Sequence, residues 1–236
     1  MADAHLGQVP EGVERAFHAF LESVPRAGDE LLVGGDLFDF WFEYRSVVPR
    51  RHIATAMKLG ALVARGIPVT FLGGNHDRWG GDFLRRDLGI AYYAGAAELE
   101  LAGRRALAVH GDGLTEQHWS GALTHWLLRQ PLTVAVFRTL HPTIGFWIAD
   151  KLSGTLADST KDAAVLDRAE AAQASYAQAL LERRPELSLV VMAHTHRARL
   201  ERRPDGRAYL NPGAFLDGGR YAVVTRQSVD LKTFEG

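Results

Sequence analysis

The chain contains no cysteine among its 236 residues. This absence excludes disulfide bonds, thiolate metal ligands and a cysteine nucleophile. An excess of charge is missing as well, because 27 Lys and Arg residues stand against 28 Asp and Glu residues. With a formal net charge of −1, the chain has no global field that would attract nucleic acid or an acidic membrane.

Long apolar runs are also absent. No segment approaches the roughly 20 apolar residues that cross a bilayer, and Met1-Ala2-Asp3 lacks the basic and apolar regions of a signal peptide. We therefore expect a cytoplasmic location. The 47% apolar and 23% charged residues are ordinary for a globular protein with a sizeable core, and the length fits one domain over residues 1–236.

Strand and helix patterns alternate along the chain, which predicts an α/β fold with a mostly parallel sheet and crossover helices. Apolar runs and alternating segments predict strands at 31–33, 69–72, 98–109 (a hairpin), 187–192, 208–210, 221–224 and 228–233. Helical stripes predict helices at 11–24, 51–65 and 163–184. From about residue 115 to residue 185 the pattern is helical and predicts a cap inserted into the domain.

Five short segments share one format, in which side chains able to bind a metal follow the tip of a strand. They are Asp3-x-His5, Gly35-Asp36-x-x-Asp39, Gly74-Asn75-His76-Asp77, His110-Gly111-Asp112 and His194-Thr195-His196. Residues i and i+2 of an extended chain face the same side, so both members of each x-separated pair can reach one cluster. Because open α/β folds place their ligands at the carboxyl ends of parallel strands, we expect one polar site there.

The residue types in these segments indicate the kind of metal. Asp, Asn and His without a thiolate favour hard or borderline divalent ions, with Mn as first choice and Fe, Zn or Ni as alternatives. Seven candidate ligands are too many for one ion and fit two ions that share a carboxylate. Two ions about 3.5–4 Å apart clamp the attacking and leaving oxygens of a phosphoryl centre and acidify a bridging water. The pattern therefore predicts a two-metal hydrolase.

The ordered set D-x-H, G-D-x-x-D, G-N-H-D, H-G-D and (G/A)-H-T-H resembles that of the calcineurin-like metallophosphoesterases. Asn211-Pro212-Gly213 resembles the terminal strand segment of the same family. We expect a four-layer α-β-β-α sandwich of two mixed sheets with a helical cap. The resemblance implies one ion on Asp3, His5, Asp36 and His196, and a second ion on Asp36, Asn75, His110 and His194.

The resemblance also implies roles for the remaining polar residues. Asp36 would bridge the two ions, and His76 would be a catalytic residue that hydrogen-bonds the scissile phosphate and protonates the leaving group. Asp77 would orient His76. Asp39 and Asp112 would lie behind the ligands and support them.

A narrower resemblance comes from the run Gly35 to Tyr44, from Val47-Val48-Pro49 and from Leu140-His141-Pro142-x-x-Gly145-Phe146. These segments are similar to the UDP-2,3-diacylglucosamine hydrolase branch of lipid A synthesis. That branch cleaves the pyrophosphate of a UDP-linked diacyl sugar and releases UMP and 2,3-diacylglucosamine 1-phosphate. The resemblance implies an amphiphilic UDP-sugar lipid as partner and allows peripheral contact with the inner membrane surface. The neutral charge balance gives no support for nucleic acid as a partner.

Several alternatives stay open. The apolar cap residues are most simply the core of a helical hairpin; they are Trp126, Leu127, Val136, Phe137, Leu140, Phe146, Trp147 and Ile148. After Leu114 the chain also departs from the branch pattern. The substrate could instead be a nucleotide, a cyclic nucleotide or a phosphoprotein, and a metal-free scaffold is a further alternative.

Other polar residues have two interpretations each. Candidate contacts to phosphate or uridine are Ser159, Thr160, Lys161, Arg168, Tyr44 and Arg45, which could equally be solvated side chains. The remaining histidines, which we interpret as structural or surface residues, are His18, His52, His118, His125 and His141.

The N-terminus is the unusual part of the pattern. Asp3 should stand at the tip of a central strand, yet only two residues precede it. We expect either that the natural chain is longer or that one parallel strand is absent.

Overall fold

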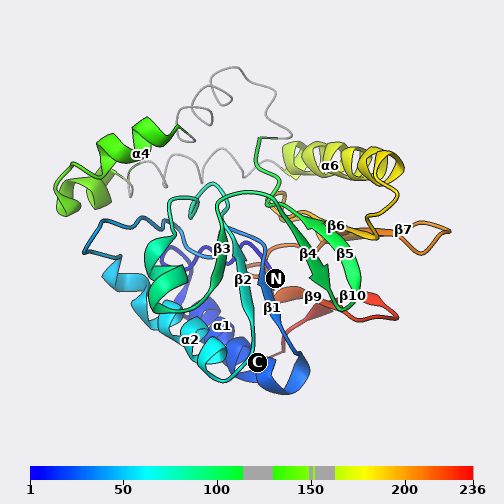
Figure 1. Cartoon of the computed structure of the whole chain (residues 1–236), viewed down its shortest axis with the longest axis horizontal. Coiled ribbons are helices and arrows are strands. Elements are labelled where there is room, and N and C mark those ends of the chain that lie inside the picture. Colours follow the sequence, from blue (N-terminus) through cyan, green and yellow to red (C-terminus); the bar gives the residue numbers. More distant parts are fainter. Residues whose placement is uncertain (114–129, 149–150, 152–162, 236) are drawn as a thin grey trace.

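The computed structural model describes residues 1–113, 130–148, 151 and 163–235. It has a mixed α/β fold, which confirms the expected alternation of strands and helices (Figure 1). The strands are β1 (Leu31–Val33), β2 (Val69–Leu72), β3 (Ala91–Tyr93), β4 (Ala97–Leu101), β5 (Arg104–Ala108), β6 (Leu189–Val191), β7 (Arg199–Arg202), β8 (Ala208–Asn211), β9 (Arg220–Val224) and β10 (Val229–Thr233). The helices are α1 (Glu11–Ala27), α2 (Ile53–Ala64), α4 (Pro131–Phe137) and α6 (Ala163–Arg183), with short turns η1 (Arg50–His52) and η2 (Phe83–Asp87).

The strands form three hydrogen-bonded sheets within the described part of the chain. Strands β1, β2 and β3 are parallel. The second sheet has the order β4-β5-β6-β8-β7, in which β5, β6 and β8 are parallel and the two edge strands are antiparallel to their neighbours. Strands β9 and β10 form an antiparallel pair. We expected two mixed sheets, and the described part of the chain has three hydrogen-bonded sheets. The exact four-layer sandwich therefore stays a prediction.

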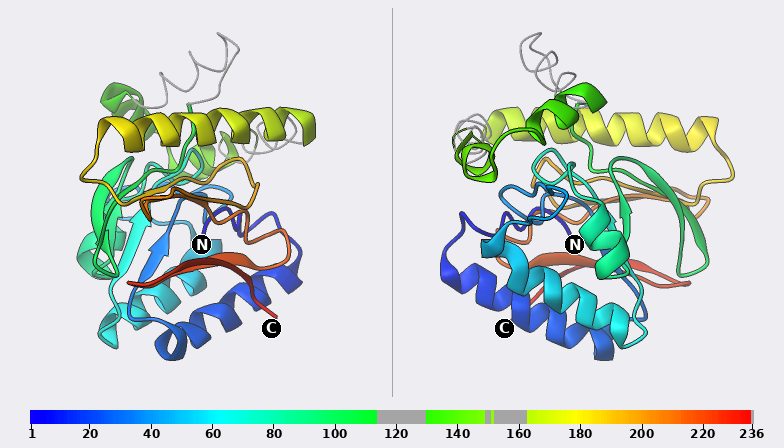
Figure 2. Two further views of the ribbon diagram at one scale, coloured as in Figure 1. Left: turned by 90° about the vertical axis from the view of Figure 1, so that its right-hand side faces the viewer. Right: turned by 60° about the vertical axis from the view of Figure 1, so that its left-hand side comes forward.

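Strand β1 shows how alternation places the first two apolar cores. Leu31 and Val33 point into a core that contains Phe17 of α1 and Leu59 of α2. Leu32 lies between them in sequence and therefore faces the opposite side, where it packs against the second core, formed with strands of the five-stranded sheet. Helices α1 and α2 thus cover the outer side of the three-stranded sheet (Figure 2).

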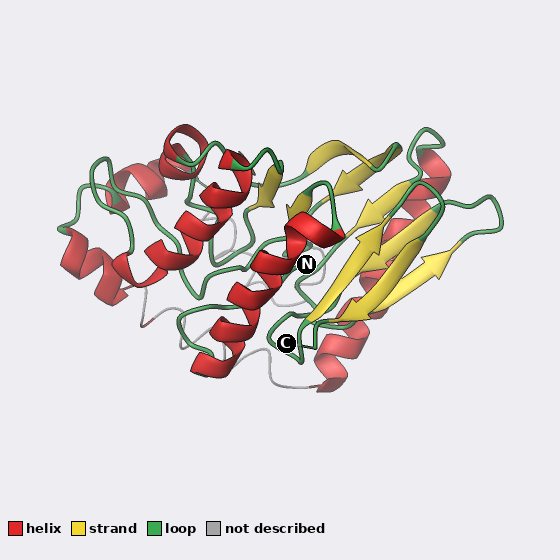
Figure 3. Ribbon diagram, turned by 90° about the horizontal axis from the view of Figure 1, so that it is seen from below, coloured by secondary structure: helices red, strands yellow, loops and turns green. Residues whose placement is uncertain are grey.

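Strand β6 separates the second core from a third one. Leu189 and Val191 belong to the second core, and Val190 belongs to the third. On the other side of this third core, α6 contributes Ala177 and Leu181. Figure 3 shows α6 behind the strands, on the side away from α1 and α2. The helix therefore lies on the outer face of the five-stranded sheet.

The described parts of the predicted cap are α4, the helical residues 142–148, and α6. Aromatic rings connect this region to the loop after β1, because the Phe137 ring centroid lies 4.7 Å from that of Phe42, and Phe146 lies 5.9 Å from Tyr44. Predicted cap residues that lie outside the described residues are His118, His125, Trp126, Leu127, Ser159, Thr160 and Lys161. The extent of the cap, 115–185, therefore stays a prediction.

The N-terminal segment runs beside the end of β1. The Met1 carbonyl accepts a hydrogen bond from the Gly34 backbone N–H, and the Asp3 N–H donates to the Gly35 carbonyl. On the other side, the N–H of Phe215 donates to the Ala2 carbonyl. Asp3 is thus held by backbone hydrogen bonds between two neighbouring segments although no strand is assigned before β1. Within the described ranges, no helix combines the length and apolar character that crossing a membrane requires.

Glu43 provides a test of the fold. Its buried carboxylate accepts hydrogen bonds from Trp41 Nε1 at 2.9 Å, from the Gly81 N–H at 3.0 Å and from the Phe83 N–H at 2.9 Å. We expect Glu43→Ala to lower the free energy of unfolding by about 3 kcal/mol, since three donors lose their acceptor. Urea denaturation measures the loss. As a control, Glu22→Ala removes an exposed partner of Lys58 and should leave stability nearly unchanged; equal effects would contradict this account.

Candidate metal centre

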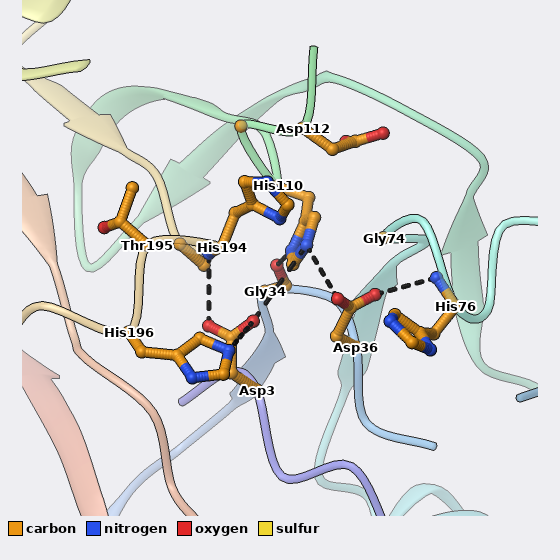
Figure 4. A network of polar contacts seen from close by, with 12 residues as sticks. Asp3, Gly34, Asp36, Gly74, His76, His110, Asp112, His194, Thr195 and His196 are labelled. Atoms are coloured by element: carbon orange, nitrogen blue, oxygen red, sulfur yellow. Dashed lines mark hydrogen bonds and ion pairs between the residues drawn. The ribbon is translucent and has the colours of Figure 1, made fainter. Parts of the chain in front are cut away.

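Four strand ends and the N-terminal segment bring the candidate ligands together (Figure 4). Asp36 follows β1, Asn75 and His76 follow β2, His110 follows β5, and the segment His194–His196 follows β6. Asp3 and His5 come from the segment beside β1. The structure thus brings these segments to the carboxyl edge of the parallel strands, where the strand-end argument expected them, and their role as metal ligands stays a prediction.

Glycines at the ends of β1 and β2 allow the close approach. Gly35 has φ +100°, and a Cβ there would lie 2.4 Å from His110 Nδ1. A Cβ on Gly74 would lie 2.2 Å from Asp36 Oδ1. Any side chain at either position would displace a candidate ligand, so the repeated Gly-Gly of the sequence is a steric requirement of the site.

The backbone of the ligands is unusual. Six described residues other than glycine have positive φ, and five of them are candidate ligands. These five are Asp3 (φ 52°), His5 (φ 45°), Asp36 (φ 50°), His194 (φ 71°) and His196 (φ 58°). Left-handed conformations of this kind cost of order 1–3 kcal/mol each and persist where surrounding contacts hold them, which is typical of functional sites.

One group of ligand atoms comes from Asp3, His5 and His196, all within 4.8 Å of one another. Asp3 Oδ1 lies 3.7 Å from His196 Nε2, while Asp3 Oδ2 accepts a hydrogen bond from the His194 backbone N–H at 3.2 Å. Asp3 is fully buried. One of its oxygens is therefore fixed by the backbone, and the other faces the histidines.

A second group consists of Asp36, His110 and His194. His110 Nδ1 donates to the Gly34 carbonyl at 2.9 Å. This bond fixes the tautomer and leaves Nε2 facing Asp36 Oδ2 at 3.1 Å. Asp36 Oδ2 also lies 3.9 Å from His5 Nε2, so this carboxylate stands between the two groups, where the predicted bridging ligand belongs.

The residues present fit metal ions. Four buried ligand atoms lack a hydrogen-bond partner within the described structure, namely Asp3 Oδ1, His5 Nε2, Asn75 Oδ1 and His110 Nε2. A buried polar atom without a partner is costly, and native proteins keep few of them. Four such oxygen and imidazole nitrogen atoms among the candidate ligands suit divalent cations.

Burial also affects the protonation states of the candidate ligands. It lowers the pKa of His5 to about 3 and the pKa of His194 to about 4, so both imidazoles are neutral near pH 7, the form that binds a metal. Burial alone would raise the pKa of Asp36, but His110 and His76 hold it well below the usual range. The central carboxylate is therefore ionised.

His76 and Asp77 differ from the expected arrangement. His76 Nδ1 donates to the Asp39 carbonyl at 2.6 Å, so Asp39 sets the ring orientation and not Asp77. The buried Asp77 carboxylate instead accepts backbone N–H groups, from Gly74 at 2.8 Å and from Leu37 at 2.7 Å. The chain turns after β1 and after β2, so these N–H groups have no partner on a neighbouring strand. The Asp77 carboxylate accepts their hydrogen bonds instead.

Asp39 and Asp112, for which we predicted a supporting role behind the ligands, pair with basic residues. The Asp39 carboxylate contacts His52 Nε2 at 2.8 Å and Arg51 at 2.9 Å. Asp112 pairs with Arg78 at 2.5 Å. His52 was interpreted as a structural or surface residue and is buried against Asp39.

Sequence reasoning missed the contribution of α6. Glu170 and Gln173 of this helix are buried and reach the ligand loops, Glu170 through Thr195 and Gln173 through the Gly111 carbonyl. Both lie at helical spacing from Ala177 and Leu181, on the face that packs against the sheet. A polar residue inside such an apolar stripe is the signal that could have identified them.

Comparisons with known proteins agree with the site. A family model described as "Calcineurin-like phosphoesterase" matches residues 1–198. A protein named UDP-2,3-diacylglucosamine hydrolase from Porphyromonas gingivalis is 35% identical over 61% of this chain and 58% of that protein. A protein of the same name from an Enterobacter species is 29% identical over 99% of this chain and 97% of that protein.

Among solved structures, an archaeal phosphodiesterase aligns with 99% of this chain and 96% of its own at 11% identity and a TM-score of 0.47. The family match extends over most of the sequence and includes all the strand-end segments that form the cluster. The chain therefore belongs to the calcineurin-like phosphoesterase family.

Proposed function

We propose that this protein is a dimetal hydrolase that cleaves the pyrophosphate of UDP-2,3-diacylglucosamine, giving UMP and 2,3-diacylglucosamine 1-phosphate. The observation that carries the proposal is the position of Asp36, an ionised carboxylate between two groups of metal-binding atoms. The substrate follows from the relatives of that name, one of which aligns with nearly the whole chain.

Two divalent ions, Mn first and otherwise Fe, Zn or Ni, would be held by the ligands predicted from the sequence. One set is Asp3, His5, Asp36 and His196, and the other is Asp36, Asn75, His110 and His194. When bound, such ions neutralise phosphoryl oxygens and lower the pKa of a water molecule, so that hydroxide is supplied near neutral pH.

His76 is the residue of this chain that would act on the substrate directly. Its Nδ1 proton is engaged by the Asp39 carbonyl, which leaves Nε2 as the nitrogen available to the scissile phosphate. In the imidazolium form the Nε2 proton would hydrogen-bond a phosphoryl oxygen and then pass to the leaving oxygen, which leaves His76 neutral with its Nδ1 proton in place. Because the leaving group of a pyrophosphate is itself a phosphate, this transfer is less important than for an alkyl ester.

Exposed apolar surface on the cap suits an amphiphilic substrate. Phe42 and Trp79 contact Phe137 of α4, so aromatic rings join the loop after β1 to the cap. In α4 and the helical residues 142–148, four large apolar residues are exposed: Leu132, Val136, Ile144 and Trp147. Acyl chains need such surface while the pyrophosphate needs the ions, and the same residues support peripheral contact of a cytoplasmic enzyme with the inner membrane surface.

A substrate panel tests the proposal. With Mn present, purified protein should hydrolyse UDP-2,3-diacylglucosamine and show little turnover of cyclic AMP, simple nucleotides or phosphopeptides. Release of UMP and of the acyl sugar phosphate, followed by mass spectrometry, measures the reaction. Preferred turnover of any other phosphoester would replace the proposed substrate and leave the dimetal chemistry intact.

Ligand variants test the metal centre. Asp36→Ala and His110→Ala should abolish turnover and lower the metal content of the purified protein, because each removes a ligand placed between or beside the two groups. Elemental analysis and the UMP assay measure both effects. His18→Ala, on α1, is the matched control and should keep metal and activity. An active Asp36→Ala protein would refute the bridging role.

His76→Ala separates catalysis from metal binding. We expect the variant to retain its metal and to lose about 10²-fold in kcat, since a positioned acid contributes roughly 10²–10⁴-fold. Metal content and steady-state kinetics, measured on the same preparation, check this. Loss of metal together with activity would show instead that His76 is a ligand.

A further inference from the structure

The buried polar network between α6 and the loop after β6 is not explained by packing alone. Glu170 is 4% exposed, and its carboxylate accepts three hydrogen bonds. Oε2 accepts from Thr195 Oγ1 at 2.6 Å and from Asn211 Nδ2 at 2.8 Å, and Oε1 accepts from the Tyr209 hydroxyl at 2.8 Å. All three partners are donors, as an ionised carboxylate requires.

Thr195 connects this network to the metal ligands. It lies between His194 and His196, whose φ angles are 71° and 58°, and its own side chain is fully buried. Asn211 Nδ2 also donates to Thr195 Oγ1 at 2.8 Å. A non-glycine residue leaves the left-handed region readily unless its neighbours hold it. The hydroxyl between the two ligands is the side-chain anchor of this loop.

The same helix reaches a second ligand loop one turn later. Gln173 Nε2 donates to the Gly111 carbonyl at 3.3 Å, directly after His110. Gly111 has φ +108°, and a Cβ there would lie 2.4 Å from Gln173 Nε2. One face of α6 therefore contacts two of the loops that carry candidate ligands, the loop after β5 and the loop after β6.

We propose that Glu170 is a positioning residue for the metal centre, which acts through Thr195 to hold His194 and His196 in their left-handed conformations. The inference rests on the proposed dimetal function. Helix α6 then takes a direct part in positioning the candidate ligands. Asn211 and Tyr209 are the other members of the network. The ligand geometry then exists before any metal arrives, which reduces the cost of binding.

The first test compares two substitutions of Thr195 in the metal-free protein. Thr195→Val keeps the shape and removes the hydroxyl, whereas Thr195→Ser keeps the hydroxyl. Mn binding is titrated with electron paramagnetic resonance of the free ion, a measurement that needs no substrate. We expect Thr195→Val to weaken Mn binding by about 10–100-fold, the usual effect of losing a group that supports a ligand, and Thr195→Ser to stay close to the wild type.

The second test concerns Glu170 itself. Glu170→Gln places an amide N–H₂ against donors and should weaken Mn binding as Thr195→Val does. The double variant Glu170→Gln with Asn211→Asp exchanges amide and carboxylate across the same contact and should recover affinity. Leu181→Ala, in the apolar face of α6, is the stability control: we expect a lower Tm with Mn affinity retained.

Unchanged Mn affinity in Glu170→Gln and Thr195→Val, with a lower Tm like that of Leu181→Ala, would overturn the inference and leave Glu170 as a residue that only stabilises the fold. Nuclear magnetic resonance of the metal-free variants gives an independent answer, because the His194 and His196 signals should shift in Thr195→Val and not in Leu181→Ala. A wild-type protein that takes up no Mn would instead refute the proposed function, so the two failures are distinguishable.

Discussion

The left-handed backbone at five candidate ligands is the constraint on which the rest of the site depends. Each such residue prefers another conformation, so the surrounding structure must supply compensating interactions. At Asp36 the buried Asp77 carboxylate accepts neighbouring N–H groups. At His194 and His196 the backbone is held by Asp3 from one side and by the Glu170 network from the other. The buried carboxylates of Asp77 and Glu170 thus help to maintain the backbone conformation of the candidate metal ligands.

The sequence predicted the ligand cluster well because its signals are local. A strand followed by Gly-Gly-Asp or by His-x-His shows in the sequence itself that polar side chains stand at the end of that strand. In a parallel sheet these strand ends lie at the same edge, so the side chains come together. Strands β3 and β7 were missed, since Ala91–Tyr93 is short and Arg199–Arg202 is a polar edge strand. Both owe their strand structure to pairing with β2 and β8, which no local pattern shows.

The errors of sequence reasoning concern contacts between distant segments. Asp77 was assigned to His76, its neighbour in the chain, but its carboxylate binds the turn after β1, 40 residues away. Glu170 was part of a predicted helix with no assigned role, and its partner Thr195 lies 25 residues further on. A side chain's rotamer and the identity of a buried partner depend on tertiary packing, so such pairings follow only from the three-dimensional structure.

The residues from Leu37 to Tyr44 have two structural roles, packing in the core and contact with the cap, which the sequence alone did not distinguish. Phe38 and Trp41 are fully buried and stack at 4.7 Å in the core against α2 and β2. The end of the run reaches the described part of the cap, where Phe42 and Tyr44 contact Phe137 and Phe146. The first half of the run therefore anchors the loop that carries the bridging carboxylate, and its end joins that loop to the cap.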